Sequence, residues 1–104
     1  MKLINLNYIP DQEISVLGLV KGNTVHSKNI GKDIGAGFKT IIGGEIKSYT
    51  EMLQEARQVA TERMIAEAES LGADAVINIR FSASELMQGS TVEMLAYGTA
   101  VKFK

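Results

Sequence analysis

The sequence contains no cysteine. A chain without a thiol forms no disulfide, offers no thiolate nucleophile and cannot hold a cysteine-ligated zinc ion or iron–sulfur cluster. Histidine is nearly as scarce, because His26 is the only one. A Ser-His-Asp triad would have to use this residue, and the Gly-x-Ser-x-Gly turn that carries many nucleophilic serines does not occur. The composition therefore excludes thiol chemistry and argues against a hydrolytic triad.

Neither sign of charge is in excess. Eleven basic residues stand against twelve acidic ones, the formal net charge is −1, and aromatic residues make up 6% of the chain. Proteins that bind nucleic acid need clustered Lys and Arg to neutralise phosphates, and often aromatic rings on which bases stack. We therefore expect no nucleic-acid partner.

Long hydrophobic runs are also missing. The longest apolar-leaning stretch, Ile14–Val20, is seven residues long, whereas a membrane-spanning helix needs about 20. The stretch that follows Met1 is interrupted by Asn5 and Asn7, which is not typical of the apolar part of a signal peptide. The sequence therefore predicts a cytoplasmic protein without a membrane partner.

The length and the composition fit one globular domain. The chain has 104 residues, of which 45% are hydrophobic and 22% are charged, as in folded rather than disordered proteins. No linker, repeat or low-complexity segment divides the chain. We therefore treat residues 1–104 as a single domain.

Two strands are predicted in the first quarter of the chain. Apolar and polar residues alternate over residues 4–8, which is typical of a half-buried strand, and Pro10 ends the pattern. The next strand, Ile14–Val25, is apolar on both faces, which predicts that both faces are covered. Gly18 and Gly22 within it indicate bulges or close approaches of another backbone.

A short helix is predicted over residues 30–42. Apolar residues recur there at spacings of three and four, the period of a helix that is buried on one side. Gly43 and Gly44 follow, and because glycine is favoured just after a helix, we expect the helix to end at this pair.

A long helix is predicted over residues 49–71. Ser48 and Glu51 have the spacing of a capping box at its start, and Gly72 follows its end. One stripe at a spacing close to 3.6 residues should face the core, and it consists of Tyr49, Leu53, Ala56, Ala60, Met64, Ala68 and Leu71.

Two more strands are predicted at the end of the chain. Over residues 75–81, Ala75, Ile77, Ile79 and Phe81 should share one side. A second alternating stretch covers residues 92–103 after a turn at residues 88–90. The expected fold class is α+β: two layers, with a four-stranded, mainly antiparallel sheet and one long and one short helix in the order ββααββ.

This architecture predicts self-association. One long and one short helix cannot cover both faces of four strands, and uncovered apolar faces usually mark sites of association. We therefore expect the main partner to be another copy of the chain.

Several motifs together resemble the YbjQ-like family, small proteins described as "putative heavy-metal-binding". They are Gly18-x-Val20-x-Gly22, Asn29-Ile30-x-x-Asp33, Ile42-Gly43-Gly44 with Tyr49, Ala56-Arg57, Leu71-Gly72-Ala73-Asp74-Ala75-Val76 and Gly98-Thr99-Ala100-Val101. The resemblance implies a dodecin-like arrangement, assembled as a ring-shaped homopentamer.

The candidate site residues are few. His26 is the only candidate imidazole ligand for a metal. Asp33 and Arg57 match the family pattern and are expected to form a bidentate ion pair between the two helices, with ligand anchoring as the alternative. Gly43, Gly44 and Tyr49 complete the candidates for cofactor or ligand binding. No catalytic residue and no particular cofactor is indicated.

Three functional hypotheses follow. The first is an uncharacterised oligomeric module, leaning non-enzymatic, that binds a small ligand at subunit interfaces or serves as a scaffold. The second is an enzyme whose site is shared between subunits. The third is a metal-binding protein with hard oxygen ligands, since thiolates are absent.

Overall fold

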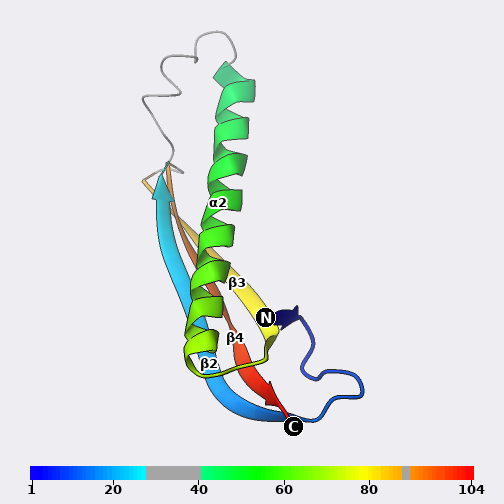
Figure 1. Ribbon diagram of the computed structural model, residues 1–104. Helices are drawn as coiled ribbons and strands as arrows, with labels where there is room; N and C mark the ends of the chain where they lie inside the picture. The colour runs from blue at the N-terminus through cyan, green and yellow to red at the C-terminus, as the bar shows by residue number, and fades with distance from the viewer. Residues whose placement is uncertain (28–40, 88–89) are drawn as a thin grey trace.

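The computed structural model describes residues 1–27, 41–87 and 90–104, and side chains only outside residues 41–47. Its elements are β1 (Lys2–Ile4), β2 (Ile14–Ser27), α2 (Ile41–Ser70), β3 (Ala75–Leu86) and β4 (Thr91–Phe103). The strands form one sheet in the order β1-β3-β4-β2. The pairs β2–β4 and β3–β4 are antiparallel, and β1–β3 is parallel. The fold is therefore α+β with a mixed four-stranded sheet (Figure 1).

The long helix confirms one prediction from the sequence and shows that two others are wrong. Helix α2 is continuous over residues 41–70, so the helix predicted over residues 49–71 is present. The predicted end at Gly43 and Gly44 is wrong, because the helix runs through both, and Ser48 lies inside the helix rather than at its start. A glycine costs a helix only about 1 kcal/mol relative to alanine, and each added residue of an existing helix gains a hydrogen bond.

The short predicted helix at residues 30–42 lies largely outside the described residues. Within the described part of the chain α2 is the one helix, so the order ββααββ and the dodecin-like arrangement are not confirmed. The turn predicted at residues 88–90 also lies mostly outside that part.

One face of the sheet packs against α2. The helix lies mainly on β2 and β4 and barely touches β3 (Figure 1). The buried members of this core are Val20, Met52, Ala56, Ala60, Met64, Ala68, Val76, Ile79, Val92, Met94, Ala96 and Ala100. The small alanines on α2 bring the helix close to the sheet, which confirms the predicted stripe except at Leu71, which is exposed.

Among the described residues, the opposite face of the sheet is covered only near the chain termini. A small cluster there is built on Ala75, Ile77 and Val101, and Ile9 and Phe103 pack against it. The N-terminal segment supplies this cover, but β1 is shorter than predicted, since Leu6 and Tyr8 lie outside the strand and are exposed. No other described segment packs on this face.

A bulge at Asn78 divides β3 into two halves. The pairing with β4 shifts between Ile77 and Arg80, and Asn78 adopts the left-handed conformation with φ of 54°. An extra residue in a strand reverses the faces of the residues that follow. The prediction that Ala75, Ile77, Ile79 and Phe81 share one side is therefore wrong, because Ile79 packs into the helix-side core and Ile77 into the opposite cluster.

Candidate functional site

A shallow hollow of about 310 Å³ lies between α2 and β3, on the helix side of the sheet. We call it the α2–β3 hollow, and its lining residues are Gln54, Arg57, Gln58, Thr61, Glu62 and Phe81. It exists because α2 lies mainly over β2 and β4 and contacts β3 little. The hollow therefore combines an aromatic floor with a polar wall that carries both charge signs.

The floor of the hollow depends on the bulge. Phe81 pairs with Ala96 across the ladder, and Ala96 belongs to the core under α2. Without the extra residue at Asn78, the alternation along β3 would place Phe81 on the opposite face. Phe81 is 49% exposed, an unusual state for a large aromatic side chain on a strand.

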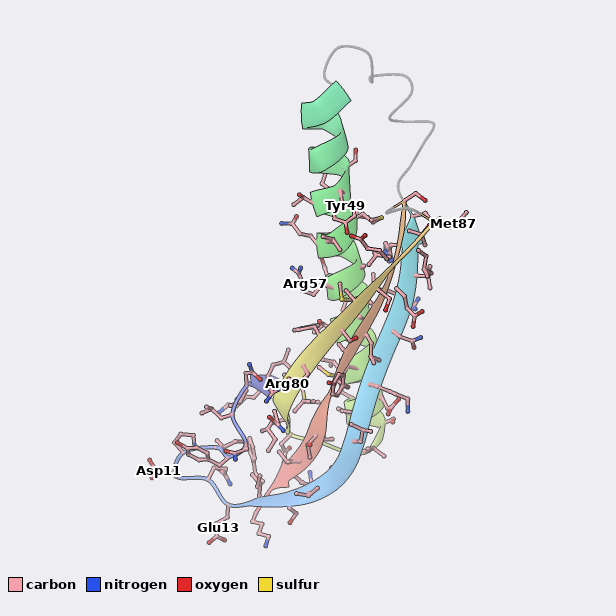
Figure 2. All side chains as sticks on the ribbon, turned by 180° about the vertical axis from the view of Figure 1, so that it is seen from behind. Asp11, Glu13, Tyr49, Arg57, Arg80 and Met87 are labelled. Atoms are coloured by element: carbon pink, nitrogen blue, oxygen red, sulfur yellow. The ribbon has the colours of Figure 1, made fainter. Side chains whose placement is uncertain are left out.

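A polar contact joins α2 to β3 beyond the hollow. The phenol of Tyr49 donates a hydrogen bond to Oε1 of Glu85. This hydrogen bond raises the pKa of Tyr49 above its ordinary value, and partial desolvation and the negative charge of Glu85 add to the effect. Figure 2 shows Tyr49 near the end of β3 that leads to Met87. Tyr49 therefore holds the far end of β3 to the helix.

His26 lies near the same end of the sheet. It pairs with Val92 on β4, which in turn pairs with Glu85 on β3, and its Nδ1 lies 3.3 Å from the hydroxyl of Thr24. The side chain is half-buried. Among the described residues no group of three or more His, Asp or Glu side chains could hold a metal ion.

The other candidates from the sequence do not form one site. Tyr49 and Arg57 are eight residues apart on α2, which is about 12 Å along a helix, and Arg57 is exposed on the side away from β2 (Figure 2). The backbones of Gly43 and Gly44 lie in the first turns of α2. Asp33 lies outside the described residues, so its pairing with Arg57 stays a prediction.

The sequence patterns do not identify two of these residues. They predict only that Phe81 shares one side of its strand with Ala75, Ile77 and Ile79, and they predict no role for Glu85. The signal that could have placed them is Asn78, a residue that tolerates positive φ, within an otherwise apolar strand.

The motif that spans residues 71–76 has a structural role. Gly72, with φ of 77°, ends α2, and the N–H of Ala73 reaches back to the carbonyl of Ala68. Two residues on, the carboxylate of Asp74 accepts a hydrogen bond of 2.7 Å from the N–H of Phe103. The segment from Leu71 to Val76 therefore fastens the end of the helix to the sheet.

In the part of the chain that the structure describes, no helix combines the length and the apolar character needed to cross a membrane.

These features define a small α+β protein with one long helix on a mixed sheet, an open hollow beside the helix, and no cluster of metal-ligating side chains among its described residues. The chain belongs to the family described as "Putative heavy-metal-binding", whose model matches residues 1–104.

Relatives of known sequence support this membership. The chain is 57% identical over 102 residues to a UPF0145 protein of Clostridium novyi (strain NT), covering 98% of each chain. It is 66% identical over 91 residues to a UPF0145 protein of Pseudothermotoga lettingae, covering 88% of this chain and 85% of the relative.

A solved structure shares the fold. It is the crystal structure of a DUF74-family protein of unknown function from Pediococcus pentosaceus. The TM-score is 0.65 at 14% identity, with 100% of this chain and 98% of the other covered. At this identity the likeness shows the fold alone.

Proposed function

We propose that this chain works as a homo-oligomeric module that holds a small ligand at the interface between copies. A ring-shaped pentamer is the form that the family resemblance implies. The observation that carries the proposal is the exposed outer surface of β2. On the face away from α2, Val16 is 67% exposed, Leu19 is 64% exposed and Val25 is 58% exposed.

Strand β2 needs a partner for two reasons. It has 14 residues and lies at the edge of the sheet, so its outward backbone groups are available to another strand. Its outer face carries the exposed apolar side chains of Val16, Leu19 and Val25 beside the polar Lys21 and Asn23, although the sequence predicted that both faces of the strand would be covered. A long edge strand with exposed apolar side chains favours association unless something covers it, and a second copy of the chain could supply that cover.

The subunit interface is also the natural place for a ligand. The α2–β3 hollow is open on one side, and ligand sites usually bury most of their ligand. Its polar wall and its aromatic floor are the mixture that such sites use. A neighbouring copy that closed the open side would complete a pocket which one copy leaves shallow.

Light scattering at micromolar concentration tests the assembly, and the expected mass is that of an oligomer. Leu19→Ser should weaken the oligomer, because it removes apolar area from the outer face of β2. The matched control is Leu71→Ser, since Leu71 is 48% exposed at the end of α2 and away from that face. A monomeric wild-type protein, or equal effects of the two variants, would contradict the proposal.

Native mass spectrometry of protein from its own host tests the ligand. A discrete organic mass for each subunit or for each ring is the expected result. An elemental signal would favour the metal-binding alternative, and an assembled oligomer without any added mass would leave the scaffold as its role.

A further inference from the structure

Two residues of the N-terminal segment bind the bulge of β3, and we call residues 5 and 6 the strap. The carbonyl of Leu6 accepts a 2.8 Å hydrogen bond from the N–H of Asn78 in the bulge. The side-chain oxygen of Asn5 accepts a 3.1 Å hydrogen bond from Nη1 of Arg80. Figure 2 shows Arg80 beside the N-terminal segment. The strap therefore contacts both the backbone of the bulge and the strand just beyond it.

The contact between Asn5 and Arg80 requires the bulge. Arg80 points away from α2, because the next residue, Phe81, lies on the helix side and successive side chains of a strand point to opposite faces. In a strand without the extra residue, the alternation would place Arg80 on the helix side instead. Its guanidinium group would then leave the position at which Asn5 binds it. The strap and the bulge therefore stabilise each other.

The partner strand β4 is also fitted to the bulge. Gly98 lies opposite it, between the two parts of the β3–β4 pairing. A side-chain carbon built on Gly98 would lie 2.7 Å from Cγ1 of Val76 and 2.9 Å from the carbonyl oxygen of Ile77. Opposite residues of a regular antiparallel pair keep their β-carbons about 4.5–5.5 Å apart, so a regular pairing has room for a side chain there. Gly98 therefore permits the bulged form of the sheet.

We infer that the strap sets the register of residues 80–86 of β3, and that its release lets this part of the strand shift by one residue. The shift would turn Phe81 and Glu85 to the opposite face of the sheet. Phe81 would leave the α2–β3 hollow, and Glu85 would leave Tyr49. The strap is thus a conformational switch within one copy of the chain, and it does not require the proposed oligomer.

Residues 80–86 have little buried surface that would oppose the shift. All of them are exposed, and Ile79 is the last buried residue of β3. Asn5 and Leu6 are exposed as well, and polar contacts in water stabilise a fold only weakly. A modest change at the strap therefore suffices to alter the balance between the two registers.

The switch would connect the N-terminal segment to the α2–β3 hollow, and this consequence rests on the proposed function. A ligand that packs on Phe81 binds only the bulged form, in which the strap is in place. Because such coupling is reciprocal, the ligand would slow the release of the strap, and release of the strap would weaken the binding of the ligand.

Hydrogen exchange, followed residue by residue with NMR, tests the inference. Asn5→Ala removes one bond of the strap. It should raise the exchange rates of the Asn78 amide and of the slowly exchanging amides of residues 81–86 by the same factor, because the shift follows only from release. A factor of roughly 3 to 10 is expected from the loss of one hydrogen bond. The amides of β2 should keep their rates, since the shift leaves the β2–β4 pairing intact.

The matched control is Asn7→Ala. Asn7 is an exposed asparagine of the same segment, and within the described residues its side chain has no hydrogen bond to β3. All rates should therefore stay as in wild type. Faster exchange at Asn78 alone would show that the strap leaves without a shift, and faster exchange in β2 as well would show a general loss of stability. Either result, unchanged rates in Asn5→Ala, or an equal effect of Asn7→Ala would overturn the inference.

Gly98→Ala gives a second reading, because the added methyl group crowds only the bulged form. The shifted register should then gain population, and Tyr49 should lose the hydrogen bond to Glu85. Its pKa should fall toward the ordinary value of about 10, as measured by tyrosinate absorbance with Tyr49→Phe in the same background as the reference. A folded Gly98→Ala protein in which Tyr49 ionises as in wild type would overturn the inference.

Deletion of Asn78 provides a further background, in case Gly98→Ala does not fold. A strand without this residue is regular and still keeps Phe81 and Glu85 on the helix side. Its register no longer depends on the strap, so adding Asn5→Ala should leave the exchange rates of residues 81–86 unchanged. An increase as large as in the full chain would show that the strap acts independently of the bulge, which would overturn the inference.

Discussion

Gly22 on β2 lies directly against Ala60 on α2. A side-chain carbon built on Gly22 would overlap the carbonyl oxygen of Ala60 and the amide nitrogen of Met64, and it would lie 2.7 Å from Cβ of Arg63. The helix and the strand therefore meet backbone to backbone, which only a glycine allows here. This contact sets how closely α2 lies on the sheet.

Gly22→Ala is expected to lower the free energy of unfolding by about 3 kcal/mol, the upper end of the usual effect of overpacking. The reason is that the added methyl group meets backbone atoms, which cannot rotate away as a side chain would. Urea denaturation followed by circular dichroism measures the change. Asn23→Ala is the control: its side chain is exposed, so a change of at most about 0.5 kcal/mol is expected. Equal effects would mean that α2 does not depend on the contact.

Asn78→Ala should lower the free energy of unfolding by roughly 1–2 kcal/mol. The φ of Asn78 is 54°, and the left-handed conformation costs residues with a β-carbon about that much, although asparagine tolerates it better than most. Asn78→Gly should remain within about 1 kcal/mol of wild type. Chemical denaturation of both variants gives the comparison. If Gly is as damaging as Ala, the side chain of Asn78 and not its backbone conformation matters.

The phenol of Tyr49 is expected to ionise above its ordinary pKa of about 10, since the hydrogen bond to Glu85 favours the protonated form. Subtracting the tyrosinate absorbance titration of Tyr49→Phe from that of wild type isolates this residue. Glu85→Gln should bring the isolated midpoint down, because it removes the negative charge. A midpoint at or below 10 in wild type would show that the contact is not formed.

The same contact predicts a dependence of stability on pH. A pKa that is raised on folding stabilises the folded protein fully below the unfolded pKa, and this stability is lost as the pH rises through the folded pKa. The free energy of unfolding of wild type should thus exceed that of Tyr49→Phe at neutral pH, and this difference should be lost only in the alkaline range above about pH 10. Denaturation of both proteins on either side of that pH measures it, and a constant difference would contradict the assignment.

Soft heavy metals are not expected to bind tightly. Such ions prefer thiolate and thioether ligands, and the chain has no cysteine, five methionines and one histidine. Titration with Zn²⁺, Cu²⁺ and Cd²⁺, followed by dialysis and elemental analysis, should leave much less than one ion for each subunit. Retention of one ion for each subunit would contradict the prediction. One ion for each ring, lost in His26→Ala, would instead show that copies of His26 converge on a symmetry axis.

Local patterns predicted the parts of the fold that depend on neighbours in the sequence. The stripe of alanines and Met64 follows the helical period, so the long helix and its buried face could be expected from spacing alone. Gly18 and Gly22 were expected to mark a bulge or a close approach. The structure confirms both, with a register shift between Val16 and Gly18 and the contact of Gly22 with α2.

The sequence by itself thus determined the class of the fold, most of the long helix but not its start, the existence of β2 and β4, and the chemistry that a chain without cysteine cannot perform. Tertiary structure alone decided the strand order, the bulge that turns Phe81 toward the helix side, and the contact between Tyr49 and Glu85. The physical reason is how far apart in the sequence the interacting residues are. Helical and strand periods arise from residues a few positions apart, whereas a bulge and the neighbours of a strand depend on which distant segment lies beside it.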